Sequence, residues 1–137
     1  MKHNIFTVQK TVRIQHCDTG GTVFTPQYFN LFTEVLEDWF AKALDYSFAH
    51  MLVTDRSGIP AMKISARFIS PSRLGDTLEY ALRVKRLRKT NVLVHMDASS
   101  AGQPRCEADF LLGFASTPKI KLAEWPAPVF SRMQSFL

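Results

Sequence analysis

The sequence predicts an α+β fold in which one long helix packs on a face of an antiparallel sheet. A helical period with a wide apolar face runs from Thr25 to Asp45, and a period of two runs through nearly every segment after Ile59. Short turn segments separate the alternating stretches, which is typical of antiparallel strands. One strand, one long helix and then four strands make an α+β arrangement.

The composition is that of a single globular domain, which we expect to cover residues 1–137. A chain of 137 residues can bury a core, and 46% hydrophobic with 21% charged residues argues against disorder. We expect no signal peptide in Met1–Thr7 and no transmembrane segment, because no stretch approaches about 18 apolar residues. Cys17 and Cys106 have no metal or redox spacing. Together these features favour a cytoplasmic protein.

The first predicted strand covers Phe6 to Ile14, because apolar and polar residues alternate there. The predicted helix follows, with the Thr25 hydroxyl as its cap and Pro26 at its first position. At about 1.5 Å per residue it spans roughly 30 Å. Its apolar face is wider than the usual stripe, so we expect other elements to wrap around it.

The rest of the chain is predicted to hold a short second helix, four strands and a tail. The second helix lies near Phe48–Val53 and ends in a turn at Asp55–Gly58. Alternating apolar residues mark the strands, which we expect to form an antiparallel meander. The members of the four sets are Met62, Ile64, Ala66 and Phe68, then Leu78, Tyr80, Leu82 and Val84, then Val92, Val94, Met96 and Ala98, then Cys106, Ala108, Phe110, Leu112 and Phe114. The tail, Lys119–Leu137, has no clear period.

Asp18 is the strongest candidate for chemistry. It lies a few residues before a helix start, where free N–H groups and the helix dipole favour developing negative charge. Ester or thioester hydrolysis needs a group that attacks or activates water, and donors for the carbonyl oxygen. Gly20 and Gly21 allow a ligand to approach the backbone. The alternative is that Asp18, like most aspartates in Gly-rich loops, only caps a turn.

The segment from Asp18 to Tyr28 has the pattern Asp-x-x-Gly-x-Val-[aromatic]-x-Pro-x-Tyr and is followed by a long amphipathic helix. This pattern resembles the hotdog-fold acyl-CoA thioesterases, above all the 4-hydroxybenzoyl-CoA thioesterase group. The Tol-Pal-associated short-chain acyl-CoA thioesterases are next. The resemblance spans about residues 5–118. It implies a curved antiparallel sheet wrapped around the central helix, and hydrolysis of an acyl-CoA to a free acid and coenzyme A.

The resemblance also implies roles for single residues. Asp18 stands where the family keeps its catalytic carboxylate, as general base or as nucleophile, and Thr25 stands where a backbone N–H polarises the thioester carbonyl. Gly21 is expected to contact substrate. The acidic residues that the family carries one turn into the helix have no counterpart at Asn30–Thr33, so a more apolar acyl group is expected than a phenolic one.

The basic turn at Arg88 and Lys89 is the candidate site for the coenzyme's phosphates. The net charge of +5 permits an anionic partner, and Arg or Lys clusters bind phosphates. The resemblance implies the same role for this turn, and a solvated turn is the alternative. Nucleic-acid binding would need aromatic residues among these charges, but Tyr80 faces the opposite side of its strand.

His16 precedes Asp18 by two residues, so on a strand end the two would face the same way and could pair. A structural histidine is the favoured alternative. Cys17 then faces the other side and is expected to be packed rather than nucleophilic. No phosphate loop, no Ser-His-Asp arrangement and no metal-ligand spacing is present, so no metal or other cofactor is expected.

Open strand edges in a single sheet predict a homo-oligomer, at least a dimer. The resemblance implies active sites at the dimer interface and makes a tetramer common. A non-catalytic acyl-CoA-binding module of the same fold is the main alternative function, with Asp18 serving only as a cap.

Overall fold

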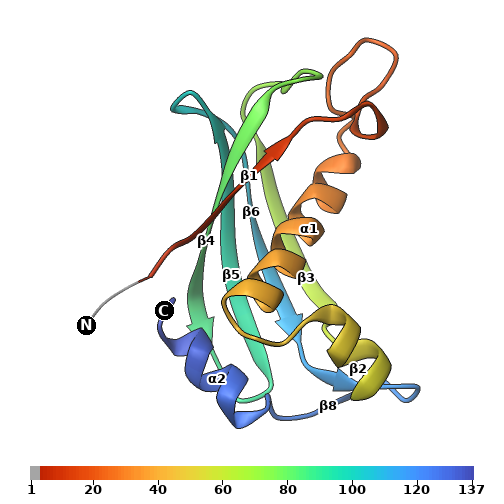
Figure 1. Ribbon diagram of the computed structural model, residues 1–137, viewed down its shortest axis with the longest axis vertical. Coiled ribbons are helices and arrows are strands. Elements are labelled where there is room, and N and C mark those ends of the chain that lie inside the picture. The colour runs from red at the N-terminus through yellow and green to blue at the C-terminus, as the bar shows by residue number, and fades with distance from the viewer. Residues whose placement is uncertain (1–3) are drawn as a thin grey trace.

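A long helix, α1 (Gln27–Lys42), lies across one face of a five-stranded antiparallel sheet in the computed structural model, which describes residues 4–137 (Figure 1). The predicted α+β arrangement is therefore confirmed. Residues 1–3, which belong to the segment where we expect no signal peptide, lie outside the described residues. No helix in the described part has the length and apolarity needed to cross a membrane.

The strand order of the sheet is β1-β4-β5-β6-β3. The strands are β1 (Phe6–Thr11), β3 (Ala61–Phe68), β4 (Thr77–Leu87), β5 (Asn91–Ser100) and β6 (Gln103–Gly113). Strands β4, β5 and β6 form the expected meander. The prediction was wrong for β3, which pairs with β6 at the far edge instead of with β4. The connection over residues 69–76 is long enough to cross the end of the sheet, so the hairpin rule does not apply to it.

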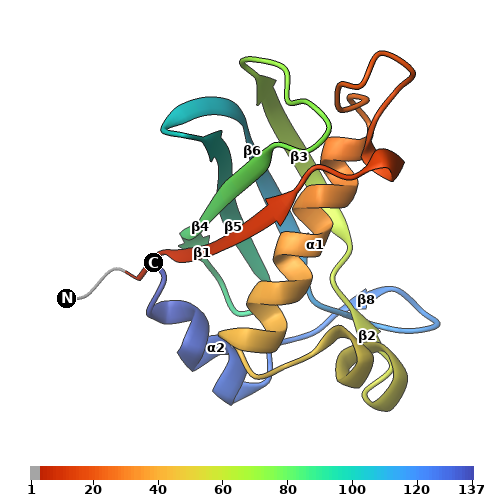
Figure 2. The same ribbon diagram turned by 45° about the horizontal axis from the view of Figure 1, so that its top comes forward.

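The core lies between α1 and the sheet. Phe32 of α1 is fully buried, and its ring contacts Tyr80 at 5.8 Å and Phe110 at 5.9 Å, both edge to face. Strands β4, β5 and β6 alternate between buried and more exposed residues, as their sequence pattern predicts. The wide apolar face of α1 is covered because the sheet curves around it (Figure 2).

The boundaries of α1 differ from the prediction. The helix has 16 residues, and no side chain caps its start. The N–H of Gln27 instead donates to the carbonyl of Phe24 at 2.7 Å, and that of Tyr28 to the carbonyl of Thr25 at 3.1 Å. This tight turn satisfies the first helical donors with backbone carbonyls, so the predicted Thr25 hydroxyl cap is wrong. At the other end the chain leaves the helix through Asp45, whose φ is 52°.

The first strand is also shorter than predicted. It ends at Thr11, and Ile14 lies in a 3₁₀ turn, η1 (Ile14–His16), where its side chain is 69% exposed. Val12 exchanges two backbone hydrogen bonds with the connection before β4, donating to Asp76 and accepting from Gly75. These bonds hold the chain at the end of the sheet, and the strand cannot continue along β4.

The tail and the segment after α1 enclose the end of the molecule opposite the start of α1 (Figure 1). The predicted second helix is confirmed as η2 (His50–Thr54), which is a π-helix. A small sheet joins β2 (Ser57–Gly58), β7 (Ala115–Ser116) and β8 (Lys121–Leu122). The tail also forms α2 (Ala127–Gln134), whose Val129 and Met133 are buried. The N–H of Val84 in β4 donates to the Phe136 carbonyl at 2.9 Å, so the tail completes the core.

Candidate functional site

The loop that carries Asp18 is a closed turn between η1 and α1. The peptide N–H of Asp18 donates to the carbonyl of Thr22 at 3.0 Å, and that of Gly21 donates to the carbonyl of Asp18 at 3.1 Å. Gly21 adopts φ of 78°, which other residues rarely adopt. A Cβ on Gly20 would lie 3.3 Å from Asp18 Oδ1, closer than most such contacts. The two glycines are therefore needed to bend the backbone around the carboxylate, and Gly21 itself does not line the cavity described next.

The two oxygens of the Asp18 carboxylate have different surroundings. Oδ1 accepts the N–H of Gly20 at 2.9 Å, with the N–H and hydroxyl of Thr22 further away at 3.4 Å each. Oδ2 has a single partner within residues 4–137, the Thr22 hydroxyl at 3.5 Å. No cation of the described chain forms an ion pair with this carboxylate. The loop thus holds Asp18 by one oxygen and leaves the other nearly unused.

A cavity of about 390 Å³ opens beside Asp18, and among the described residues Asp18 is the one charged side chain that lines it. Its wall combines polar groups with apolar side chains, and three of the apolar side chains are well exposed: Phe24 is 52%, Phe68 44% and Ile69 42% accessible. The other lining residues are Thr22, Val23, Thr25, Tyr28, Ser70 and Pro71. The cavity therefore suits an uncharged apolar group next to a carboxylate.

Thr25, which lines the same cavity, has a peptide N–H without an acceptor among the described residues. The N–H groups of Val23, Phe24, Gln27 and Tyr28 all donate to backbone carbonyls, and Pro26 has none to donate. No acceptor in residues 4–137 takes the N–H of Thr25. A peptide N–H without an internal partner can donate to the oxygen of a bound carbonyl.

His16 has a structural position. It is 4% exposed in the 3₁₀ turn and not on the expected strand end, so the pairing with Asp18 that the sequence left open does not form. Its Nδ1 accepts the N–H of Arg13 at 3.0 Å, and its Nε2 lies 3.5 Å from the carboxylate of Glu34 in α1. His16 thereby joins the loop to the helix. The favoured alternative from the sequence, a structural histidine, describes these contacts.

Arg88 and Lys89 lie at the other end of the sheet from Asp18. The Asp18 loop bonds to the connection before β4, through the N–H of Leu74 and the carbonyl of Gly21 at 2.9 Å. Arg88 and Lys89 follow the end of β4, and 11 residues at about 3.4 Å each put them more than 30 Å away. Both are exposed, and neither forms an ion pair with the described residues. One chain does not bring the predicted phosphate site and Asp18 together.

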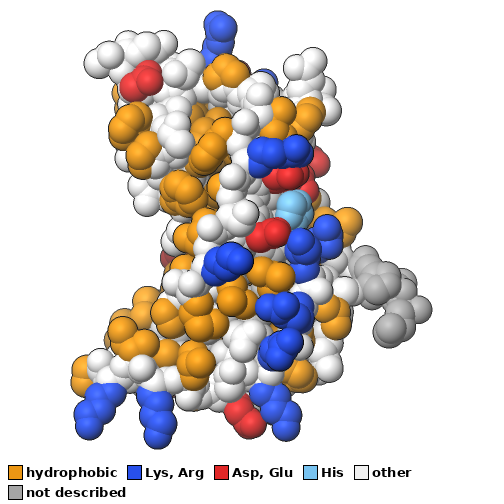
Figure 3. All heavy atoms as spheres, turned by 180° about the vertical axis from the view of Figure 1, so that it is seen from behind, with side chains coloured by type: hydrophobic (Ala, Val, Ile, Leu, Met, Phe, Trp, Pro, Cys, Tyr) orange, Lys and Arg blue, Asp and Glu red, His pale blue; other side chains and the backbone are white. Residues whose placement is uncertain are grey.

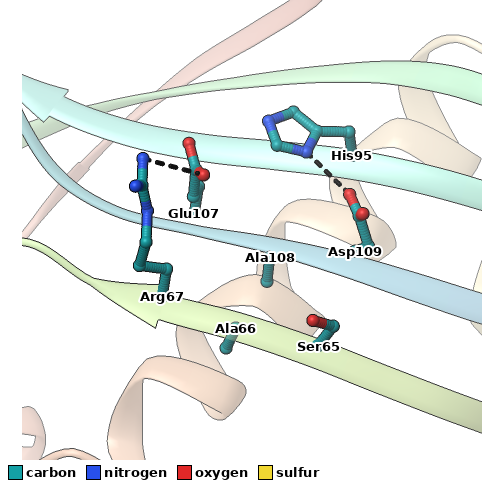
Figure 4. A pocket seen from close by; sticks show the side chains of 7 residues that line it. All are labelled: Ser65, Ala66, Arg67, His95, Glu107, Ala108 and Asp109. Atoms are coloured by element: carbon teal, nitrogen blue, oxygen red, sulfur yellow. Dashed lines mark hydrogen bonds and ion pairs between the residues drawn. The ribbon is translucent and has the colours of Figure 1, made fainter.

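A second cavity, of about 350 Å³, lies on the face of the sheet away from α1 (Figure 4). Two ion pairs line this cavity, and no motif in the sequence predicted either of them. His95 Nδ1 and Asp109 Oδ1 are 2.7 Å apart, and Arg67 and Glu107 are 3.2 Å apart. The register of β5, β6 and β3 brings these residues together, since Asp109 lies opposite both His95 and Ser65.

Both carboxylate oxygens of Asp109 form a hydrogen bond with a neighbouring side chain. Lys85 bonds its Oδ2 at 3.1 Å while His95 bonds its Oδ1. Partial burial alone would raise the pKa of Asp109, but the bonds from His95 and Lys85 outweigh burial and hold that pKa below its usual value. Seen from behind, this face shows acidic, basic and histidine side chains close together (Figure 3). Lys85 and His95 therefore occupy both sides of the Asp109 carboxylate, and neither of its oxygens is left free.

Comparison with known proteins gives one family and a group of similar structures. Residues 12–133 match the model of the thioesterase-like superfamily. The 1,4-dihydroxy-2-naphthoyl-CoA thioesterase from Synechocystis superposes with a TM-score of 0.85 at 21% identity, over 96% of this chain and 96% of that chain. The 4-hydroxybenzoyl-CoA thioesterase from Pseudomonas sp. strain CBS-3 gives 0.83 at 21% identity, over 93% and 97%.

A hypothetical protein from Staphylococcus aureus, solved in complex with CoA, gives a TM-score of 0.87 at 12% identity, over 99% of this chain and 85% of that chain. No curated protein sequence matches. The predicted hotdog fold is confirmed by these structures together with the family match.

Proposed function

Because this chain belongs to the thioesterase-like superfamily, we propose that it hydrolyses an acyl-CoA thioester to a free acid and coenzyme A. The main support for this proposal is the pair of residues that line one cavity. This cavity is lined by Asp18, which keeps a nearly unused carboxylate oxygen, and by Thr25, which keeps an unpaired peptide N–H. Two similar structures are thioesterases of aromatic acyl-CoAs, and a third was solved in complex with CoA.

The proposed chemistry needs only these two groups and water. As general base, Asp18 takes a proton from a water molecule while that water attacks the thioester carbonyl. The carbonyl oxygen becomes an oxyanion that accepts the Thr25 N–H, and the tetrahedral intermediate then expels coenzyme A as the thiolate. As nucleophile, Asp18 would attack the carbonyl itself, release the thiolate and form a mixed anhydride that water hydrolyses. Both routes use the same open oxygen and no metal or other cofactor.

The acyl group proposed for this cavity is uncharged and apolar. Its wall offers aromatic and aliphatic side chains and no cation, and a charged acyl end would lose hydration there without a partner. Arg88 and Lys89 are proposed to bind the phosphates of the coenzyme, and the partner is thus a small molecule rather than nucleic acid or a membrane.

The distance between the two ends of the sheet makes an oligomer part of the proposal. Asp18 and the basic turn of one chain are too far apart to hold one coenzyme, so the turn would come from a second copy. Strand β3 is an open edge, and all its residues are exposed, which leaves it free to pair. We therefore propose a homodimer or homotetramer.

A non-catalytic acyl-CoA-binding module remains the second candidate. The observation that favours it is the 2.9 Å bond from Gly20 to Asp18, because this carboxylate does cap its own loop. Such a module would bind coenzyme A esters and release no thiol.

Thiol release from a panel of aromatic and aliphatic acyl-CoAs, with wild type and Asp18→Asn compared, tests the proposal. Asparagine keeps an oxygen that can accept the Gly20 N–H, so the loop cap survives while the basic oxygen is lost. We expect kcat to fall by about 10² or more, with an unchanged unfolding temperature. Equal rates in both proteins, or binding of acyl-CoA without turnover by wild type, would favour the binding module.

A further inference from the structure

An apolar strip on β3 faces the helix side of the sheet but is left uncovered. Ile64 and Phe68 lie opposite Phe110 and Cys106 of β6, and those two partners are buried in the core. Residues directly opposite each other share a face of the sheet. Ile64 and Phe68 nevertheless remain 42% and 44% exposed, because β3 is the edge strand. The alternation in this strand therefore does not correspond to a buried face.

Phe68 stands between this strip and the Asp18 cavity. Its ring lies 5.5 Å from that of Tyr28 and 6.4 Å from that of Phe29, edge to face in the second case. Both partners belong to the first turn of α1, so the ring spans the space between the helix start and the edge strand. Phe68 lines the Asp18 cavity, whereas Ile64, four residues before it on the same face, does not.

We propose that Phe68 is the specificity-determining residue that limits the length of the acyl group, a proposal that rests on the proposed hydrolysis. With the aromatic ring present, the cavity ends at Phe68 and accepts a compact apolar acyl group. Without the ring, the cavity joins the strip beside Ile64, and a longer chain can lie along it. The cavity offers the apolar side chains of Phe24 and Ile69 and the strip offers that of Ile64, so the change alters acyl length more than acyl polarity.

The expected size of the effect follows from apolar burial. Each further methylene that enters an apolar site changes an equilibrium constant by roughly fourfold. Two or more additional methylenes along the strip therefore change the preference between long and short acyl groups by at least about tenfold. Short acyl groups that never reach Phe68 should be affected little.

The experiment measures kcat/KM for acetyl-, butanoyl-, hexanoyl-, octanoyl- and decanoyl-CoA with wild type, Phe68→Ala and Ile64→Ala. Ile64→Ala is the matched control, since it removes an exposed apolar side chain from the same face of the same edge strand. In Phe68→Ala we expect the ratio of decanoyl- to butanoyl-CoA to rise about tenfold. In Ile64→Ala we expect no increase in that ratio.

A milder variant, Phe68→Leu, keeps an apolar side chain and should give a smaller rise in the same ratio if the alanine variant does not fold. A uniform change across the series in the Phe68 variants, or an equal rise in Ile64→Ala, overturns the assignment of Phe68. If wild type releases no thiol from any acyl-CoA, the proposed hydrolysis itself fails, and that result is distinct from activity with an unshifted preference.

Discussion

Two carboxylates of this protein line cavities of similar volume, and their surroundings differ. The cavity beside Asp18 measures about 390 Å³ and the one beside Asp109 about 350 Å³. Asp109 is bonded through one oxygen to His95 and through the other to Lys85. Asp18 is bonded mainly through one oxygen to its own loop and forms no ion pair with any cation in residues 4–137. The size of a cavity does not distinguish them, whereas the availability of an oxygen does.

The comparison also separates a structural carboxylate from a candidate catalytic one. A base must be able to accept a proton from water, and a carboxylate that already accepts two charge-assisted bonds has lost much of that capacity. The histidine near each carboxylate supports the same distinction. His95 bonds directly to Asp109, while His16 contacts Glu34 instead of Asp18. We therefore expect Asp109 to affect stability and Asp18 to affect turnover.

The largest expected effect is the contrast between these two residues in activity. Asp18→Asn is expected to lower kcat by about 10² or more, and Asp109→Asn to change it by no more than about twofold, because Asp109 lies on the opposite face of the sheet. Thiol release under identical conditions measures both. A comparable loss in Asp109→Asn, with an intact fold by circular dichroism, would contradict the assignment of the site to the Asp18 cavity.

An intermediate effect is expected at the basic turn. Replacing both Arg88 and Lys89 by alanine removes two cations proposed to bind phosphates, and we expect KM to rise roughly five- to tenfold with little change in kcat. The rise in KM with added salt should be weaker in this variant than in wild type. Arg83→Ala is the control, since it removes an exposed cation from the middle of β4. An equal rise in KM for Arg83→Ala would show a general charge effect instead of a phosphate site.

The smallest expected effect concerns the stability that Asp109 supplies. Its folded-state pKa lies below the ordinary 3.8, so its contribution is present above that value and is lost as the pH falls through the lowered pKa. Asp109→Asn should lower the unfolding temperature by about 3 °C at neutral pH, as expected for a loss near 1 kcal/mol. The difference from wild type should close in acid. A gap that persists unchanged at pH 3 would show that ionisation of Asp109 is not its source.

The sequence was sufficient to predict those features that depend on a single segment of the chain. The alternation in β4, β5 and β6 predicted both the strands and their buried faces, since each of these strands has one face against α1 and the other away from it. The Asp18 loop could also be predicted from the sequence, because a carboxylate, two glycines and a helix start lie within the ten residues from Asp18 to Gln27 and define a local geometry. The lack of a partner for the Thr25 N–H could not be predicted, since it depends on which carbonyls the neighbouring donors reach.

Tertiary structure decided everything that depends on which segments meet. It placed β3 at the edge beside β6 and so exposed Ile64 and Phe68, whose pattern in the sequence is that of a half-buried strand. It turned His16 into the interior, and it joined His95 to Asp109 across two strands. The sequence by itself determined the α+β class, the central helix and the candidate carboxylate, because local periodicity and local turns encode them. The pairing order of the strands set the open edge, the acyl wall and the ion pairs of Asp109, because contacts between distant residues exist only after the sheet has formed.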